Sequence, residues 1–127
     1  MEATILVVED DRSVREVLYL HLSNAGYKVL LAEDAIVAGQ YLLEQHVDLL
    51  IADIAMPYMD GLDLVRAIRG DRAICSLPVI FVTSHPEHEG TAKELGAVAY
   101  FSKPLHADLL LATVANQLKP RTAREVS

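Results

Sequence analysis

Short apolar runs alternate with amphipathic segments along this chain, and this alternation limits its fold more than any other feature. Five runs have the length and composition of buried strands. They span residues 4–9, 28–32, 48–53, 78–82 and 98–102. Strands that alternate with helices form a parallel sheet covered on both faces, and right-handed crossovers place the helices in two layers. We therefore predict an α/β fold with one doubly wound, five-stranded parallel sheet in a three-layer sandwich.

The segments between the runs carry the start and stop signals of helices. Apolar residues recur at helical spacing in the first segment, and Gly26 ends it. Asp34 is placed to cap the second helix, in which the pattern turns Leu42 and Leu43 toward the core. Asp60 is placed to cap the third helix. The last two helices are predicted over about residues 86–95 and 105–118.

Composition excludes several classes of protein. The 127 residues suffice for one core, and no apolar run reaches the roughly 20 residues that span a bilayer. The formal net charge of −7 argues against nucleic acid binding, which needs a basic patch. Cys75 is the only cysteine and is expected to be small, semi-buried and unreactive. His85 and His88 are expected on a solvated helix face rather than at a metal. With no leader in view, we expect a cytoplasmic protein without a membrane contact.

Charged and hydroxyl side chains follow four of the apolar runs. Glu9-Asp10-Asp11 ends the first run and Asp53 ends the third, while Thr83 and Lys103 follow the fourth and fifth. The carboxyl ends of parallel strands meet at one edge of the sheet, so these side chains are expected to lie together. Two carboxylates about 4 Å apart repel by roughly 4 kcal/mol at an effective dielectric near 20. The sequence therefore predicts a cation at this edge, and oxygen ligands favour Mg²⁺.

In their order and spacing these pieces resemble the receiver domain of bacterial two-component response regulators. The resemblance covers residues 4–119 and rests on the following segments: Val8-Glu9-Asp10-Asp11, Asp53, Met56-Pro57, Met59-Asp60-Gly61, Phe81-Val82-Thr83-Ser84 and Lys103-Pro104. It implies a flavodoxin-like sandwich with strand order 2-1-3-4-5. We expect residues 1–119 to form the domain, and residues 120–127 to be a C-terminal tail or the start of a linker.

The resemblance implies a phosphoacceptor at Asp53, charged in a Mg²⁺-dependent step. Asp10, Asp53 and the backbone carbonyl of Ala55 would bind Mg²⁺ directly, and Glu9 would act through water. Asp11 is expected to cap the first helix instead. Related domains often carry a polar side chain where this chain has Ala55. The small side chain of Ala55 is expected to leave the acyl phosphate open to water.

Three further residues would complete the resemblance. Lys103 would pair with Asp53 at rest and later with a phosphoryl oxygen, and Thr83 would donate its hydroxyl to another. Thr83 and Tyr100 would form a switch, in which the hydroxyl moves toward the phosphoryl group and the ring turns inward. The simpler interpretation of Tyr100 is a half-buried strand residue with its hydroxyl in water. By the same analogy Pro104 is expected to follow a cis peptide bond.

The resemblance also implies protein partners. A histidine kinase or histidine phosphotransfer protein would dock over the site, where five apolar residues are expected at or near the surface: Tyr19, Leu20, Met56, Pro57 and Pro104. Scattered surface apolar residues are the simpler interpretation of this set. A downstream protein target or a fused effector domain would respond to phosphorylation. The face formed by the fourth helix, fifth strand and fifth helix would carry this response and offers a dimer contact.

Two other classes share parts of the pattern. A hydrolase that forms an aspartyl phosphate needs a general acid near its nucleophile, typically an Asp at the position of Ala55. A carrier of a flavin phosphate needs a Ser, Thr or Gly-rich loop after the first strand, where Glu9-Asp10-Asp11 would repel it. We therefore expect a signalling domain that assists its own phosphorylation and dephosphorylation, not an enzyme. It is either free-standing or part of a longer regulator or hybrid kinase.

Overall fold

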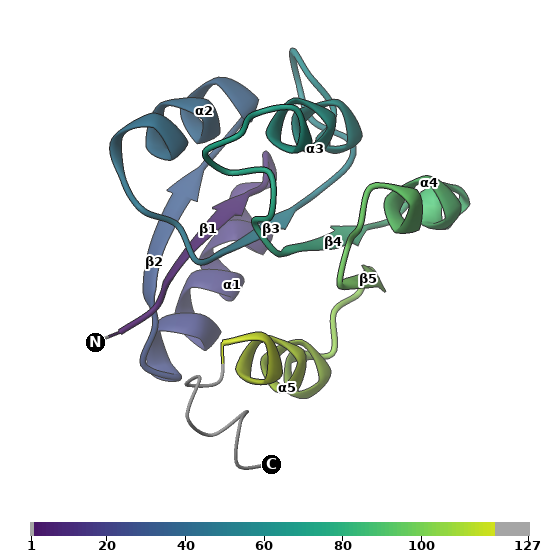
Figure 1. Ribbon diagram of the computed structural model, residues 1–127. Helices are drawn as coiled ribbons and strands as arrows, with labels where there is room; N and C mark the ends of the chain where they lie inside the picture. Colours follow the sequence, from purple (N-terminus) through teal and green to yellow (C-terminus); the bar gives the residue numbers. More distant parts are fainter. Residues whose placement is uncertain (1, 119–127) are drawn as a thin grey trace.

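A computed structural model describes residues 2–118 and contains one parallel sheet of five strands in the order β2-β1-β3-β4-β5 (Figure 1). The strands are β1 (Thr4–Val8), β2 (Lys28–Ala32), β3 (Leu49–Ala52), β4 (Val79–Thr83) and β5 (Ala99–Ser102). Each strand pairs in parallel with its neighbour, so all five carboxyl ends lie at one edge. The predicted α/β fold and strand order are confirmed.

Helices cover both faces of the sheet (Figure 1). They are α1 (Arg12–Asn24), α2 (Ala35–Glu44), α3 (Gly61–Arg69), the 3₁₀ turn η1 (Pro86–His88), α4 (Glu89–Glu94) and α5 (Ala107–Gln117). α1 and α5 pack on one face, while α2, α3 and α4 pack on the other. None of the described helices is both long enough and apolar enough to cross a membrane.

Side chains from the two faces of the sheet form two separate hydrophobic cores. Successive strand residues point to opposite faces, so Ile5 and Val7 of β1 contact the α1 and α5 side, whereas Leu6 and Val8 contact the α2 and α3 side. All four are buried. Burial on both faces explains why the strands read as continuous apolar runs without alternation.

Aspartates begin three of the helices, as the sequence predicts. Asp11 Oδ1 accepts from the backbone N–H groups of Ser13 at 2.9 Å and Val14 at 3.2 Å. Asp34 and Asp60 cap α2 and α3 in the same way. Each cap satisfies a donor that the helix itself leaves unpaired and is worth about 1 kcal/mol.

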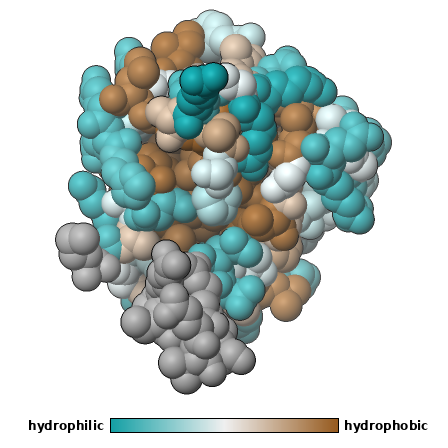
Figure 2. Space-filling model, in the orientation of Figure 1, coloured by the Kyte–Doolittle hydropathy of each residue, from teal (hydrophilic) through white to brown (hydrophobic). Residues whose placement is uncertain are grey.

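Two expectations of the sequence about burial are wrong. Leu43 does not face the core, because Ala35, Ala38 and Leu42 already form the inner stripe of α2 and the next position turns outward; its exposed fraction is 87%. Figure 2 shows apolar side chains at the surface over α2. Cys75 is exposed on the loop before β4, not semi-buried.

The last two helices are shorter than predicted. α4 has only six residues and follows η1, and α5 begins at Ala107 instead of residue 105. Pro104 does follow a cis peptide bond. Residues 120–127, expected as a tail or linker, lie outside the described residues.

Candidate functional site

The site lies at the carboxyl edge of the sheet, and backbone hydrogen bonds fix the residues that follow the strands. Each of these residues extends the strand ladder by one bond, which limits the directions in which its side chain can point. The bonds run from Glu9 N to Ala32 O at 3.0 Å, from Asp53 N to Val8 O at 3.0 Å and from Lys103 N to Thr83 O at 2.9 Å. The predicted site residues are thus held at adjacent strand ends.

The Lys103 ammonium lies between two buried carboxylates. Its Nζ donates to Asp53 Oδ2 at 2.8 Å and also to Glu9 Oε1. The exposed fractions of the side chains are 2% for Glu9, 8% for Asp53 and 21% for Lys103. Little water screens this triad, so its electrostatic interactions are much stronger than those of a surface pair.

The triad changes the acidity of all three groups. Burial, followed by a hydrogen bond shared with Asp53, raises the pKa of Glu9 to about 8 in spite of Lys103. Burial also opposes ionisation of Asp53, but bonds with Glu9 and Lys103 outweigh it and hold the pKa of Asp53 below its usual value. Burial opposes the charge of Lys103 as well, and its two carboxylate bonds keep its pKa above the usual value. The two directions favour ionisation of Asp53 before Glu9.

Three carboxylates at this edge fit a divalent cation. Glu9, Asp10 and Asp53 each offer one oxygen, and these oxygens lie within 4.8 Å of one another. Glu9 Oε2 is buried without a hydrogen-bond partner among the described residues. A buried carboxylate oxygen needs a proton or a cation, and all-oxygen donor sets suit Mg²⁺. Ala55 follows on the exposed loop after Asp53.

Thr83 and Tyr100 both contact the peptide groups of His85. The Thr83 hydroxyl is fully buried and accepts from His85 N at 3.1 Å. The Tyr100 hydroxyl donates to His85 O, and its ring lies 6.5 Å from that of Phe81. Tyr100 is half-buried, with its hydroxyl directed at the turn between β4 and η1. The two residues expected as a switch are thus connected through one residue.

Three contacts at the site were not predicted from the sequence. Lys103 pairs with Glu9 as well as with Asp53, and Arg15 Nη1 donates to Glu9 O at 2.8 Å. Gly61 packs directly on the backbone of Asp53, and its N–H donates to Ile54 O at 2.8 Å. The Asp-Gly pair after the strand is a sequence signal for the last contact. No spacing rule points to the first two.

Apolar residues border the site. Val14, Val17, Pro104 and Leu105 line a hollow of about 270 Å³ beside Lys103. Among the residues expected for docking, Tyr19 and Leu20 are exposed and line a second hollow with Leu31. The other three lie in the loops at this edge: Met56, Pro57 and Pro104.

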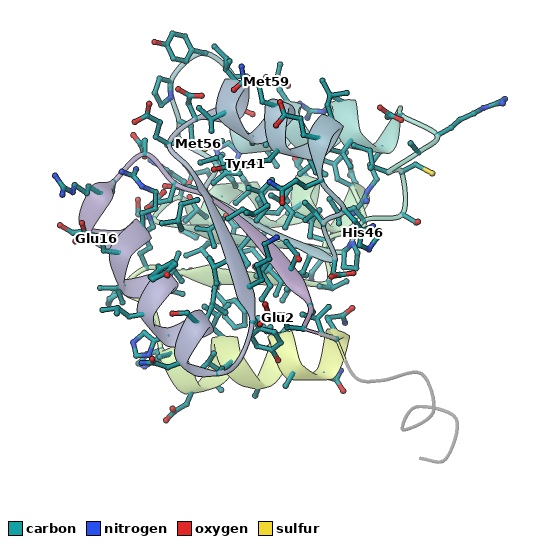
Figure 3. The ribbon with its side chains drawn as sticks, turned by 90° about the vertical axis from the view of Figure 1, so that its left-hand side faces the viewer. Glu2, Glu16, Tyr41, His46, Met56 and Met59 are labelled. Carbon is teal, nitrogen blue, oxygen red and sulfur yellow. The ribbon has the colours of Figure 1, made fainter. Side chains whose placement is uncertain are left out.

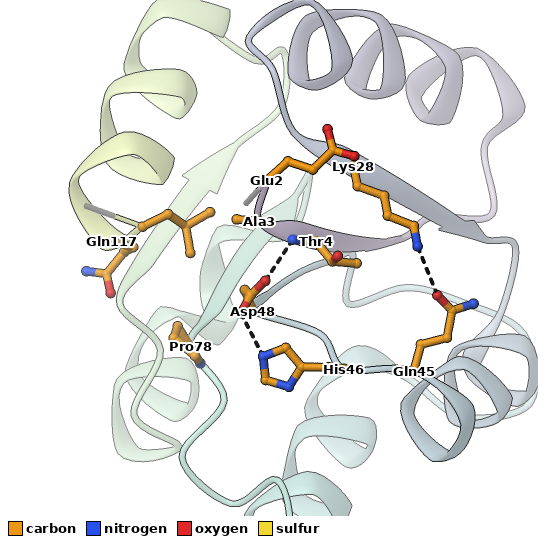
Figure 4. A pocket seen from close by; sticks show the side chains of 10 residues that line it. Glu2, Ala3, Thr4, Lys28, Gln45, His46, Asp48, Pro78 and Gln117 are labelled. Atoms are coloured by element: carbon orange, nitrogen blue, oxygen red, sulfur yellow. Dashed lines mark hydrogen bonds and ion pairs between the residues drawn. The ribbon is translucent and has the colours of Figure 1, made fainter. Parts of the chain in front are cut away.

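The opposite end of the sheet carries a different kind of hollow. Figure 3 shows Met56 and Met59 near one end and Glu2 and His46 toward the other. The hollow there has about 810 Å³, and in it Asp48 accepts from Thr4 N and contacts His46, both at 2.8 Å (Figure 4). These bonds fix the start of β1, which is a structural role.

Comparisons with known proteins agree with this geometry. Residues 5–115 match the family model described as "Response regulator receiver domain". The chain is 36% identical over 130 residues to the response regulator MprA of Mycobacterium tuberculosis, covering 98% of the chain and 56% of that protein. It is 30% identical to the phosphate regulon transcriptional regulatory protein PhoB of Pseudomonas aeruginosa, covering 91% of the chain and 52% of that protein.

Solved structures give the same result. A putative response regulator from Chloroflexus aurantiacus superposes with a TM-score of 0.88 at 32% identity, over 94% of this chain and 100% of that one. Chemotaxis protein CheY4 of Vibrio cholerae superposes with a TM-score of 0.86 at 31% identity, over 93% and 100%. The chain spans about half the length of the curated relatives that it matches. The family match, the strand order and the acidic site at the strand ends all lead to the same conclusion. The chain belongs to the response regulator receiver domain family.

Proposed function

We propose that Asp53 accepts a phosphoryl group, and that residues 1–119 are the domain built to promote this transfer. The observation that carries the proposal is the Asp53 carboxylate, buried at the sheet edge and paired with Lys103 at 2.8 Å. An ionised carboxylate can attack phosphorus and hold the group as a mixed anhydride. The lowered pKa of Asp53 and the raised pKa of Glu9 make Asp53 the member of the acid pair that ionises more readily.

The transfer exchanges one bond for another. An Asp53 oxygen forms a bond to phosphorus while the bond between phosphorus and the donor breaks, and the electron pair leaves with the donor group. That donor is the phosphorylated imidazole of a histidine kinase or histidine phosphotransfer protein. Asp53 Oδ1 accepts from Ile54 N at 2.7 Å, which orients the carboxylate during the attack. Lys103 Nζ donates to Asp53 Oδ2 and is placed to donate to a phosphoryl oxygen instead once the group is attached.

The acid residues would hold the Mg²⁺ that this family uses. Asp10, Asp53 and the carbonyl of Ala55 are the direct ligands in this proposal, and Glu9 contributes through water. The unpartnered oxygen of Glu9 supports the assignment. When bound, the ion neutralises negative charge on the carboxylates and the phosphoryl group.

Thr83 and Tyr100 transmit the change in this proposal. In this proposal the Thr83 hydroxyl moves toward the phosphoryl group to donate to it, and this movement strains or breaks the bond that it now accepts from the His85 N–H. Tyr100 holds the carbonyl of the same residue, so a movement of His85 also releases the Tyr100 hydroxyl. The phosphorylated state is thereby coupled to the surface around η1, α4 and β5.

The apolar residues around the site indicate where partner proteins would bind. We propose that the phosphoryl donor protein docks over the hollow beside Lys103 and over the exposed Tyr19 and Leu20. The face of α4, β5 and α5 serves a downstream target, a fused effector domain or a dimer contact. The whole chain acts as a signalling domain, and nucleic acid binding is not among its roles.

The test is incubation with acetyl phosphate and Mg²⁺, followed by intact mass measurement. Wild type gains one phosphoryl group, and Asp53→Asn gains none. Asp108→Asn is the matched control, because Asp108 is exposed in the first turn of α5 and is not a member of the acid cluster, and it gains the group as wild type does. A phosphoryl group on the Asp53→Asn protein would overturn the assignment.

A further inference from the structure

One guanidinium ties three chain segments together at the end of the sheet that lies away from Asp53. Arg69 Nε donates to Leu95 O at 2.8 Å, and Arg69 Nη1 donates to Cys75 O at 2.9 Å and Leu77 O at 2.7 Å. Arg69 is the last residue of α3, and Leu95 is the C-cap of α4. Cys75 and Leu77 belong to the loop that enters β4.

Only an arginine satisfies this arrangement. Helix ends leave carbonyls without intrahelical partners, and Leu95 O is one of these. A guanidinium donates from several nitrogens in a fixed plane, whereas a lysine donates from a single point. Arg69 is half-buried and forms no salt bridge within residues 2–118, so its contacts there are to backbone carbonyls. It thus links the end of α4 to the frame of the sheet.

The other end of α4 is held quite differently. α4 buries one side chain, Ala92, and η1 buries none. The turn that leads into them is held by His85, through its N–H to Thr83 and its carbonyl to the Tyr100 hydroxyl. Hydrogen bonds from a charged donor are about twice as strong as neutral ones. The three bonds from Arg69 are therefore harder to break than the two bonds of His85.

We propose that Arg69 is a positioning residue that fixes the C-terminal end of α4, so that phosphorylation moves η1 and the N-terminal end of α4 alone. This inference rests on the proposed function of Asp53. It follows from which end carries the switch pair and which end carries the guanidinium. The changing surface is then the one around Glu87 and His88, while Leu95 and Gly96 keep their places.

Three amides report on the two ends separately. The Gly96 and Ala97 N–H groups bond to Lys93 O at 2.9 Å and Ala92 O at 3.1 Å, so their hydrogen exchange measures the fixed end. The His85 N–H bonds to the Thr83 hydroxyl and measures the switch end. Exchange rates by NMR resolve these amides individually in the complete chain.

The first comparison uses unphosphorylated protein. Arg69→Ala is expected to speed exchange at Gly96 and Ala97 about tenfold relative to wild type. The matched control is Arg66→Ala, because Arg66 is exposed on the same helix and pairs only with Asp63 within the described residues; it should change these rates by less than about twofold. Arg69→Lys keeps the charge without the planar donors and should give an intermediate rate even if Arg69→Ala fails to fold. Equal exchange rates at Gly96 and Ala97 in all Arg69 and Arg66 variants would show that Arg69 does not fix the C-terminal end of α4.

The second comparison adds acetyl phosphate and Mg²⁺. In wild type, phosphorylation should change exchange at His85 severalfold and leave Gly96 and Ala97 unchanged. In the Arg69 variants it should change all three, a result that simple loss of stability does not give. Equal changes at both ends of wild type would overturn the inference. Intact mass is recorded on each sample: absence of a phosphoryl group would overturn the proposed function, and the first comparison would still decide whether Arg69 holds α4.

Discussion

Gly61 approaches the backbone of Asp53 so closely that no other residue fits at its position. A Cβ on Gly61 would lie 2.1 Å from Asp53 O and 3.0 Å from Asp53 C. The atoms it would meet belong to backbone, so no flexible side chain can move aside. The first turn of α3 therefore supports the peptide group that carries the candidate phosphoacceptor.

Gly61→Ala is expected to lower the free energy of unfolding by about 3 kcal/mol, since relief of the clash requires α3 or Asp53 to shift. Phosphorylation by acetyl phosphate should slow as well, because Asp53 moves relative to Lys103. Urea denaturation and the time course of intact mass measure the two effects.

Gly39→Ala is the matched control for this variant. Gly39 lies within α2, and a Cβ there meets nothing within 4 Å. Alanine should raise the free energy of unfolding by about 0.5–1 kcal/mol, because it is the better helix former. If both alanine variants were equally stable, the close approach of Gly61 to Asp53 would have no energetic consequence.

The sequence predicts the fold well because its information is local and repeated. Each strand is a short apolar run and each helix an amphipathic segment, so the order of elements already implies a parallel sheet. The placement of Asp53 and Lys103 follows from that sheet, since both come directly after strands. The same logic explains why Asp11, Asp34 and Asp60 are recognisable as caps.

What the sequence does not predict depends on contacts between elements. Periodicity shows which residues of α2 can face inward, but the small Ala35 and Ala38 determine which ones do, and Leu43 is left outside. The Glu9–Lys103 pair joins residues 94 positions apart and depends on how deeply Glu9 is buried. The reach of Arg69 to Leu95 likewise depends on how α3 and α4 end.

Tyr58 is held in the left-handed region with φ of 71°, which is unfavourable for a residue with a Cβ. Its exposed fraction is 81%, so its side chain contributes little packing. Tyr58→Gly should raise the free energy of unfolding by about 1 kcal/mol, and Tyr58→Val should lower it by about 1 kcal/mol. Urea denaturation of the two variants tests this. Equal stability of both would show that the backbone relaxes without a penalty at this position.

Ala55 is exposed two residues after Asp53, and we expect its small side chain to leave the acyl phosphate open to water. Ala55→Asn should lengthen the life of the phosphorylated form, because a larger polar side chain blocks the approach of water to the acyl phosphate. The half-life is followed by intact mass after the phosphoryl donor is removed. Ala73→Asn changes an exposed alanine on the loop before β4 and should leave the half-life unaltered. Equal half-lives in wild type and Ala55→Asn would contradict the expectation.

The proton on Glu9 makes stability depend on pH. Its pKa is about 8 in the folded protein against a usual value of 4.5, so between these values the folded state binds more protons than the unfolded state. Stability therefore falls as pH rises through this window. The lowered pKa of Asp53 acts in the acid range, and the raised pKa of Lys103 acts in the alkaline range, so neither contributes there.

Glu9→Gln should remove this dependence, because glutamine resembles the protonated acid at every pH. In the presence of EDTA, the variant and wild type should have similar stability at pH 5. At pH 9, wild type should be less stable by on the order of 3 kcal/mol, the effect of ionising Glu9 beside Asp53. Saturating Mg²⁺ should restore wild type at pH 9, since a cation stabilises the ionised carboxylates. Urea denaturation of both proteins at pH 5, 7 and 9 measures the difference in their stability. Parallel stability curves for the two proteins would show that Glu9 is ionised throughout this range, and that Lys103 alone compensates both carboxylates.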